Sequence, residues 1–406
     1  MAIAQLPLVH RGITSRRLKG GVFVLEGLNA LGTTAFFYYV YFYTQAKFGF
    51  DALHNLLLAA FLGTVYAVAA FFGGRFAQRF GYFTSVQVGL AVMITTFLIG
   101  SQIEGLATTL GLIVLGNVGL CFTWPALEAL MSEGEPPLRL QSMVGIYNVT
   151  WATCGAIAYF AGGAMLQKWG LKSIFFVPTA VLVVELGLSF WLEQAVERQP
   201  PPDVEAERPL LRPTSEAFSS VLSPRVFLSM ALLANPLAYL AINTLISTAP
   251  TLALRLHLTR MAAGFVCSIW LFVRAGAFVF LRLWPRWHYR FRFLAGAYVA
   301  MIISFGAMLL WENFWALIAA QCLFGMSIGL IYYSSLFYSM DVSDTKGEHG
   351  GIHEAAIGAG NAFGPGLAAV ALALYPHRLG IGAMAVCVLL LLGLGGLFWL
   401  RYRARD

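Results

Sequence analysis

Apolar stretches of about 20 residues recur along both halves of this 406-residue chain. At roughly 1.5 Å of rise per residue, each stretch is long enough for an α-helix to cross the hydrocarbon core of a bilayer. We place twelve of them, which predicts an all-α integral membrane protein. The composition agrees with this prediction, because 59% of the residues are hydrophobic and only 11% are charged. A soluble protein of this size needs more polar side chains to cover its surface.

A polar segment, residues 194–224, interrupts the apolar pattern near the middle of the chain. It includes three consecutive prolines at 200–202, which lack backbone donors and favour an extended, solvated conformation. Two mostly apolar segments of similar length, residues 1–193 and 225–406, lie on either side of it. We therefore predict two six-helix bundles joined by a cytoplasmic linker.

Positive side chains are distributed unevenly between the two sides of the predicted bundles. About three quarters of the 26 Lys and Arg residues fall on segments that share a side with the N-terminus. The positive-inside rule then predicts cytoplasmic termini in a multi-pass protein of the cell (inner or plasma) membrane. The net charge of +7 is therefore a topology signal, and no nucleic-acid partner is expected.

The sequence indicates neither a metal site, nor a cofactor, nor an enzyme. The five cysteines fall on five different predicted helices without metal-ligand spacing. His349 and His353 could bind a metal ion, but we place them in a solvated loop without two further ligands. Residues 325–329 match the G-x-S-x-G motif of serine hydrolases, but glycines four apart in an apolar helix are typical of close helix packing.

Polar side chains in the first half follow helical stripes. Glu26 and Asn29 share one face of the helix predicted at 21–43. A carboxylate at the centre of a membrane helix costs about 2.5 kcal/mol or more, so Glu26 is expected to serve a function, although it could also be solvated near the cytoplasmic end. The other candidate binding residues of this half are Asn117 and Trp124, on a stripe at 107–131 that continues to Glu128, and Asn148 and Trp151 at 143–165. For Glu185, at 173–191, a structural and a transport role remain equally open.

In the second half, Arg274 is the most informative residue. A guanidinium cannot lose its proton to escape the low dielectric, so Arg274 must meet a counter-ion, carbonyl groups, water or an anionic substrate. We expect it to pair with Glu26 when the inner side of the protein is closed. The remaining candidate binding residues of this half are Asn235, Tyr239, Asn243, Trp270, Gln321, Tyr332, His353, Glu354 and Asn361.

A weak internal repeat relates the two halves. Residues 145–148 read Gly-Ile-Tyr-Asn, and residues 351–354 read Gly-Ile-His-Glu at the start of the predicted eleventh helix. Such self-similarity is typical of transporters that arose by duplication of a six-helix unit. Asn148 and Glu354 would then occupy equivalent positions.

Two glycine motifs resemble those of the major facilitator superfamily. Residues 74–81 read GRFAQRFG between the second and third predicted helices, which is similar to the G-x-L-a-D-R-x-G loop of that family, with Gln78 in place of the usual aspartate. Residues 351–369 resemble the glycine-proline motif of its antiporters, although here the motif lies in the eleventh helix. The resemblance covers the whole chain, and the gating residues that it implies are Gly74, Gln78, Arg79, Gly81, Gly360, Gly364 and Pro365.

The resemblance implies two pseudosymmetric six-helix bundles around a cavity lined by the first, fourth, seventh and tenth helices. We therefore expect the protein to be a monomeric secondary transporter that moves a small molecule by alternating access, with protons bound at Glu26, Glu354 or both. Two alternatives remain open, an uncoupled facilitator and a membrane sensor that binds a ligand without transporting it. The sequence names neither the substrate nor the direction of transport.

Overall fold

The computed structural model describes residues 13, 15–132, 135, 137–199, 222–311, 313–342, 346–376, 378 and 380–404, and over these residues it contains helices and no strand. The first half contains α1 (Arg16–Phe37), α2 (Val40–Phe48), α3 (Ala52–Phe80), α4 (Tyr82–Gly100), α5 (Leu106–Ser132), α6 (Pro137–Trp169) and α7 (Ser173–Glu197). The second half contains α8 (Pro224–Arg255), α9 (Arg260–Cys267), α10 (Ile269–Leu283), α11 (Phe291–Leu310), α12 (Phe314–Val342), α13 (Lys346–Leu374) and α14 (Ile381–Arg403).

Over the residues that the structure describes, twelve helical segments are long and apolar enough to cross a membrane, which confirms the predicted number of spans. Two of the spans are broken. The first consists of α1 and α2, and the eighth consists of α9 and α10, with Ser268 between them. Both were predicted as continuous helices. Neither break contains a proline or a glycine, so no local sequence signal marked it.

The polar segment at the middle of the chain is shorter than predicted, because the flanking helices extend into it. α7 ends at Glu197, and α8 begins at Pro224 directly after Ser223, which occupies the N-cap position without a side-chain hydrogen bond. Proline at the first position of a helix costs no backbone hydrogen bond, which explains why α8 starts there. Most of the predicted linker, residues 200–221, lies outside the described residues.

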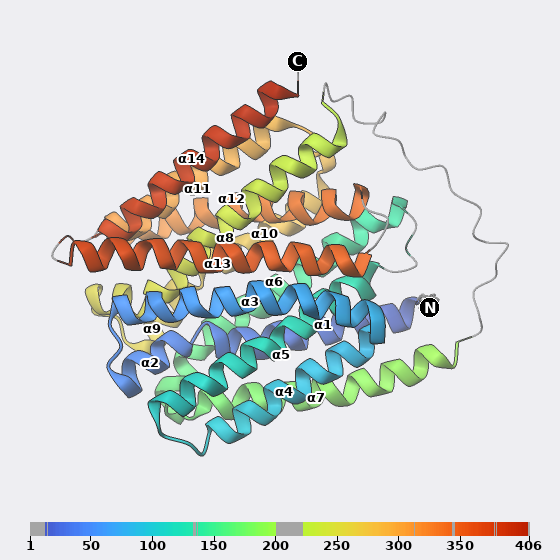
Figure 1. The fold of residues 1–406 in the computed structure, drawn as a ribbon, viewed down its shortest axis with the longest axis horizontal. Coiled ribbons are helices and arrows are strands. Elements are labelled where there is room, and N and C mark those ends of the chain that lie inside the picture. The colour runs from blue at the N-terminus through green and yellow to red at the C-terminus, as the bar shows by residue number, and fades with distance from the viewer. Residues whose placement is uncertain are drawn as a thin grey trace, which may run out of the picture.

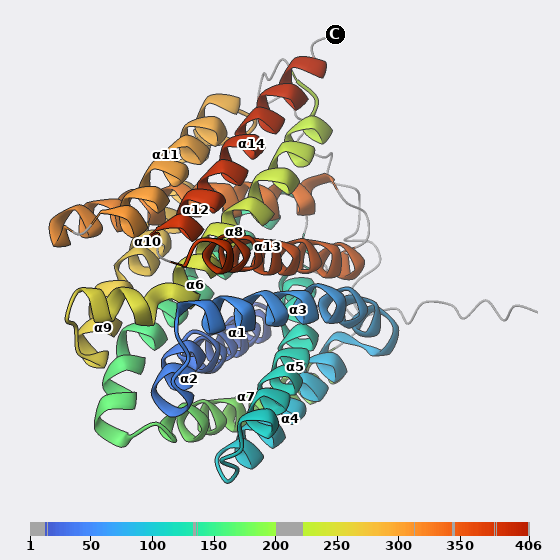
Figure 2. The same ribbon diagram turned by 60° about the vertical axis from the view of Figure 1, so that its left-hand side comes forward.

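The helices form two groups that meet along two seams (Figures 1 and 2). α1–α7, coloured blue to green, form one group, and α8–α14, coloured yellow-green to red, form the other. In the first seam α3 runs beside α13, and in the second α6 packs against α9 and α10. These contacts join the two six-helix halves.

The repeated glycines of the two halves occupy corresponding places in these seams. We call the end of the bundle that carries the start of α1 the inner end. There, Gly351 of α13 lies against Gly74 of α3, and Gly145 of α6 lies against Arg282 and Tyr333 of the second half. The repeat detected in the sequence therefore marks the inner contacts between the halves.

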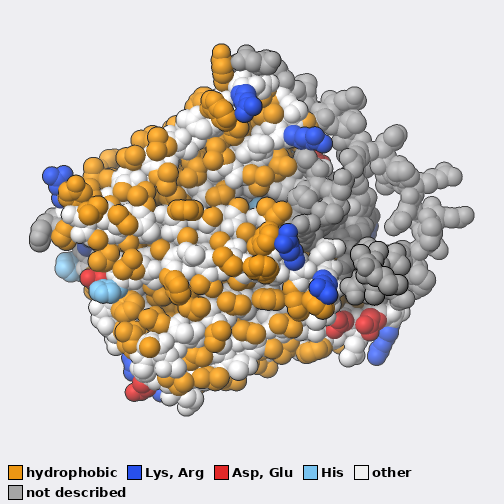
Figure 3. All heavy atoms as spheres, in the orientation of Figure 1, with side chains coloured by type: hydrophobic (Ala, Val, Ile, Leu, Met, Phe, Trp, Pro, Cys, Tyr) orange, Lys and Arg blue, Asp and Glu red, His pale blue; other side chains and the backbone are white. Residues whose placement is uncertain are grey.

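The outer surface is apolar (Figure 3). Hydrophobic side chains cover most of the visible face, while Lys and Arg lie near its edges. On α3, the exposed residues Leu57, Phe61, Val68 and Phe72 recur at helical spacing. A helix that faces lipid needs such a stripe, because the hydrocarbon region offers no partner for polar groups.

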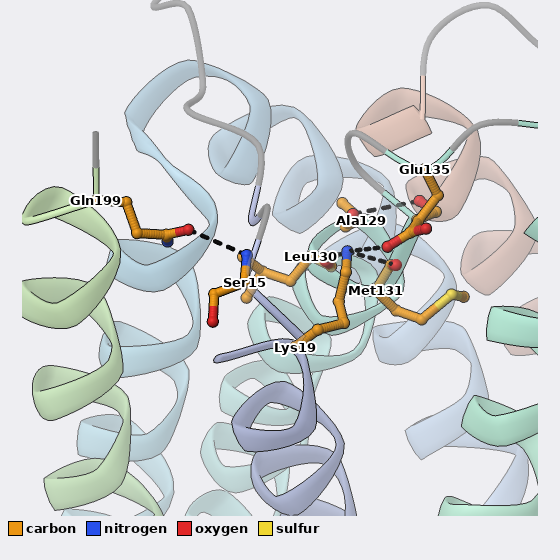
Figure 4. A network of polar contacts seen from close by, with 8 residues as sticks. Ser15, Lys19, Ala129, Leu130, Met131, Glu135 and Gln199 are labelled. Carbon is orange, nitrogen blue, oxygen red and sulfur yellow. Dashed lines mark hydrogen bonds and ion pairs between the residues drawn. The ribbon is translucent and has the colours of Figure 1, made fainter. Parts of the chain in front are cut away.

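Lys19 holds the inner end of α1 to the end of α5 (Figure 4). Its ammonium group donates to the carbonyl oxygens of Leu130 at 3.2 Å and Met131 at 2.9 Å, and it pairs with Glu135 at 3.3 Å. The last carbonyl groups of a helix have no partner within the helix, so a cation there is favourable. This contact lies within the first half and fixes the position of α1 beside the central cavity.

Candidate functional site

A cavity of about 150 Å³ lies between the two halves, and its walls come from α1, α2, α3, α5, α6, α8, α10, α12 and α13. The structure therefore places the cavity among more helices than the four expected from the family resemblance. Nine of the predicted binding residues line it: Asn117, Trp124, Trp151, Tyr239, Asn243, Arg274, Tyr332, Glu354 and Asn361.

The other predicted residues lie outside this lining. Glu26 and Asn29 are fully buried, and Ala30 is the α1 residue nearest the inner end that lines the cavity. The remaining five are Asn148, Asn235, Trp270, Gln321 and His353. Asn148 accepts a hydrogen bond from the indole of Trp151 at 3.2 Å, and Asn235 contacts His353 at 3.3 Å. Trp270 and Gln321 line a second, smaller cavity.

A cluster of ionisable side chains borders the central cavity and bridges the two halves. Nδ1 of His353 lies 3.5 Å from Oε1 of Glu128 and 3.9 Å from Oε1 of Glu354. The hydroxyl of Tyr66 donates to Oε2 of Glu354. Tyr66 and Glu128 belong to α3 and α5 in the first half, whereas His353 and Glu354 belong to α13 in the second. We call these four residues the bridging cluster.

The prediction that His353 lies in a solvated loop is wrong. α13 begins at Lys346, so His353 and Glu354 are in its second and third turns, and both side chains are buried. Their burial follows from the α3–α13 seam, where Gly351 permits close approach to Gly74. The side chain of His349 lies outside the described residues.

The bridging cluster can hold protons or a metal ion. The ligand atoms of Glu128, His353 and Glu354 lie within 4.8 Å of one another, close enough for one cation. Metal-binding carboxylates are usually held in place by outer hydrogen bonds, whereas neither carboxylate oxygen of Glu128 has a hydrogen-bond partner. A buried carboxylate without such partners is most stable when protonated. The arrangement therefore favours proton binding.

Arg274 points into the cavity between two indole rings. Its guanidinium carbon lies 4.5 Å from the centroid of the Trp151 ring and 5.0 Å from that of Trp270. Cation–π contacts of this kind contribute roughly 1–2 kcal/mol and orient the guanidinium, but they leave its charge uncompensated.

The predicted ion pair between Glu26 and Arg274 is not formed, although the inner ends of the two halves are in contact. Both carboxylate oxygens of Glu26 lack a hydrogen-bond partner, and no ion pair of Arg274 occurs among the described residues. The reason is the position of Glu26, which lies one turn below the cavity on α1, where the neighbouring Gly27 packs against Cys154 of α6. The two groups therefore lie on different levels of the protein.

The predicted gating glycines lie where helices approach closely. Added Cβ atoms at Gly360 and Gly364 would collide with the carbonyl oxygens of Pro236 and Leu240 on α8. Gly81 joins α3 to α4 with a φ of 106°, a conformation that glycine adopts without strain. Two other gating candidates have contacts within the α3–α4 region: the side-chain oxygen of Gln78 accepts a hydrogen bond from the hydroxyl of Tyr82 at 3.1 Å, and the guanidinium of Arg79 lies over the ring of Phe80. Gly74 contacts Gly351 in the α3–α13 seam, and Pro365 lies inside α13.

Two hydrogen bonds join the halves at opposite ends of α6. At the inner end, Arg282 donates to the hydroxyl of Ser142 at 3.3 Å. At the outer end, the backbone amide of Met261 donates to the side-chain oxygen of Gln167 at 3.0 Å. The halves are therefore in contact at both ends of the cavity.

Two residues of the bridging cluster, Tyr66 and Glu128, were not among the binding residues predicted from the sequence. Glu128 could have been found, because it ends the polar stripe that includes Asn117 and Trp124. Tyr66 offered no such signal, since it is one aromatic residue in a helix with many apolar neighbours. Only the contact of α3 with α13 places its hydroxyl against Glu354.

Comparisons with known proteins agree with this architecture. A sequence model of the Major Facilitator Superfamily matches residues 22–365. A quinate permease of Neurospora terricola is 28% identical over 152 residues, which cover 34% of this chain and 28% of that protein. A tetracenomycin C resistance and export protein of Streptomyces glaucescens is 28% identical over 140 residues, which cover 33% of this chain and 25% of that protein. The matched part thus spans little more than a quarter of the curated relatives' own length.

Solved structures show the same fold. The human organic anion transporter MFSD10 matches with a TM-score of 0.69 at 14% identity, covering 96% of this chain and 99% of that one. The nucleoside transporter NupG matches with a TM-score of 0.65 at 12% identity, covering 95% and 98%. The family and these relatives are transporters and not enzymes. With twelve spans and a family match over most of its length, the chain belongs to the major facilitator superfamily.

Proposed function

We propose that the protein is a secondary transporter that moves a small molecule by alternating access and couples this movement to protons. The observation that carries the proposal is the bridging cluster, in which buried ionisable groups of both halves meet at the wall of the central cavity. A change of protonation there acts on the contact between the halves and on the binding site together.

Alternating access requires the two ends of the cavity to open in turn. Opening the inner end would separate Ser142 from Arg282 and Gly351 from Gly74. Opening the outer end would separate Gln167 from Met261. Hydrogen bonds of this kind contribute about 1 kcal/mol each, so neither end is closed irreversibly.

Proton coupling would use Glu354 and Glu128. When both are ionised, their charges repel across the seam at low dielectric, and the contact between the halves weakens. A shared proton, together with His353 and the hydroxyl of Tyr66, holds them together. Glu26 can bind a further proton, because it is buried without a hydrogen-bond partner, although it lies outside the cavity.

The names of the relatives suggest a first compound to test and leave the direction of transport open. Several curated relatives are quinate permeases, whereas another is an export protein. We therefore select quinate for the first uptake measurements. The protein is proposed to act as a monomer in the cell membrane.

For the orientation, we propose that both termini are cytoplasmic, as the distribution of positive residues predicts. Single cysteines at Gly105, in the α4–α5 loop, and at Ser215, which lies outside the described residues, should react from opposite sides of the membrane. Reaction of both from outside would contradict this topology.

Proteoliposomes test the coupling. A pH gradient should drive quinate accumulation by the wild type, and Glu354→Gln should abolish this accumulation while leaving exchange between equilibrated compartments intact. Glu185→Gln is the matched control, because Glu185 is equally buried but lies on α7, away from the cavity. Accumulation by Glu354→Gln at the wild-type level would refute coupling at this residue, and transport that never responds to pH would indicate a facilitator.

A second measurement tests alternating access without a known substrate. In a cysteine-free background, the pairs Ser142→Cys/Arg282→Cys and Gln167→Cys/Met261→Cys should each cross-link, and their rates should change in opposite directions between pH 8 and pH 5. Rates that are independent of pH for both pairs would indicate a static protein, as expected for a sensor that does not transport.

A further inference from the structure

Arg274 is a buried permanent cation without an anionic partner among the described residues. Its side chain is 2% exposed, and its Nε atom has no hydrogen-bond partner. Glu354, the acidic residue that lines the cavity, is already engaged by the hydroxyl of Tyr66 and lies next to His353. A buried charge that lacks a partner costs several kcal/mol, so the cavity provides a strong site for an anion.

The surroundings of Arg274 fit a planar anionic group. Its guanidinium is held between the rings of Trp151 and Trp270, and it presents parallel N–H donors that match a carboxylate in bidentate geometry. Because the indoles restrict the side chain, little entropy is lost when a carboxylate binds.

The size and walls of the cavity restrict the rest of the ligand. The cavity holds about 150 Å³, and a cavity of about this volume accommodates one benzene ring. Aromatic rings of Trp124, Trp151, Tyr239 and Tyr332 form much of its wall. Such rings pack against the faces of another ring. The cavity therefore limits the ligand to about one six-membered ring.

Amide groups on the cavity wall add a second polar region. The amide nitrogen of Asn117 donates to the carbonyl oxygen of Leu62 at 2.8 Å, and that of Asn243 donates to the carbonyl oxygen of Asn361 at 3.4 Å. One N–H of each amide is engaged in this way, and the side-chain oxygens can act as acceptors. Acceptors on the wall of a binding cavity select ligand groups that donate, such as hydroxyls.

We propose that the cavity binds a carboxylate monoanion built on one hydroxylated six-membered ring. Its carboxylate pairs with Arg274, its ring packs among the aromatic side chains, and its hydroxyls donate to Asn117 and Asn243. This assignment rests on the proposed transport function, because it makes the central cavity the substrate site.

Ligand binding to the purified full-length protein in detergent tests the assignment. Two indoles flank Arg274, so tryptophan fluorescence and thermal stabilisation should both report binding. The probes are 3,4-dihydroxybenzoate, benzoate, and the neutral 3,4-dihydroxybenzamide. The amide should bind at least about tenfold more weakly than the corresponding carboxylate, and benzoate should lie between them. Equal affinity for the amide and the carboxylate, or no binding of either carboxylate at millimolar concentration, would overturn the proposal.

Variants locate the anion site. Arg274→Gln should weaken 3,4-dihydroxybenzoate binding at least about tenfold, and Arg274→Lys should have a smaller effect because it keeps the charge without the planar fork. Arg292→Gln, which removes an exposed arginine at the start of α11, is the matched control and should bind as the wild type does. If Arg274→Gln binds 3,4-dihydroxybenzoate like this control, Arg274 is not the anion site.

The outcomes separate this inference from the proposed function, because binding in detergent requires no transport. Selective carboxylate binding that depends on Arg274, without uptake into proteoliposomes, would refute transport and keep the ligand class. Uptake of a substrate that depends on the pH gradient but not on a carboxylate group would refute the ligand class and keep transport.

Discussion

The two seams between the halves differ in how their helices approach each other. In the α3–α13 seam, backbones approach closely along the helices, with Gly63 against residues 361 and 362 and Gly358 against Ala67. In the α6 seam, Gly163 at the outer end meets the backbone of Arg260 and Gly264, whereas Gly145 at the inner end meets the side chains of Arg282 and Tyr333.

The difference between the seams also concerns charge. The α3–α13 seam includes the bridging cluster, whereas the α6 seam includes aromatic rings, such as Trp151 and Phe278 with centroids 5.6 Å apart. At the repeated position, the second half has Glu354 where the first has Asn148. A nearly symmetric scaffold thus places ionisable groups in one seam and aromatic packing in the other.

The largest effect should come from filling the α3–α13 seam. In Gly358→Ala, the new methyl group would lie 2.6 Å from the Cα atom of Ala67 and collide with backbone that cannot move alone. We expect a loss of about 3 kcal/mol in stability. The melting temperature and the yield of monodisperse protein in detergent measure it.

Two further alanine variants allow the loss of stability to be compared between the two seams. Gly145→Ala would meet Cδ of Arg282 and the hydroxyl of Tyr333, each at 2.7 Å, and because these side-chain ends can shift, we expect a loss of about 1 kcal/mol. Gly366→Ala, on the same helix as Gly358, is the control, since its methyl group would lie 3.6 Å from Ala60. Equal losses for Gly358→Ala and Gly145→Ala would show that the seams do not differ in this way.

Much of this fold could be predicted because membrane proteins obey a few strong local rules. The length of each apolar stretch determines a span, and the twelve spans were found from it. The glycine at 81 also marked the α3–α4 connection correctly, because its φ of 106° requires glycine.

The site was less predictable, because it depends on how helices from the two halves are aligned. A helical stripe shows which residues share a face, but it does not show their depth relative to a stripe on another helix. For this reason Glu26 was expected to meet Arg274, whereas it lies below the cavity, and the contact of Glu128 with His353 was missed. Both errors concern the alignment of helices that are far apart in the sequence.

The inner connections that follow α3 and α10 also differ between the halves. After α3 the chain turns at Gly81, whereas after α10 it forms the short 3₁₀ segment Pro285–Trp287 and buries His288 against Phe337, with ring centroids 4.3 Å apart. Burial lowers the pKa of His288 to about 4.

Because the pKa of His288 is lower in the folded than in the unfolded protein, the stability that it contributes is complete above pH 6.5 and is lost as the pH falls towards 4. Its protonation should cost about 2 kcal/mol of stability at pH 5 relative to pH 7.5. Melting temperatures at the two pH values, compared with those of His288→Phe, which retains a ring but does not titrate, measure this cost. The same pH response in both proteins would assign the effect to other groups.

The smallest expected effect concerns the two hydrogen bonds at opposite ends of the α6 seam. Ser142→Ala removes the bond from Arg282 at the inner end, and Gln167→Ala removes the bond from Met261 at the outer end. Each should change the balance between conformations by less than about 1 kcal/mol, because solvent competes for these exposed groups. The direction of each shift in this balance distinguishes the two ends. Ser142→Ala should favour inward opening, and Gln167→Ala should favour outward opening.

A cysteine at Thr33, on the cavity wall, measures this balance through its rate of modification from each side of the membrane. Each single variant should change the ratio of the two rates by less than about fivefold, in opposite directions. In the double variant the changes should cancel if the two ends act independently, since sites at opposite ends of a helix usually contribute additively. A ratio that shifts in the same direction in both single variants would mean that the α6 seam opens as one unit, and alternation between the ends would then have to arise in the α3–α13 seam.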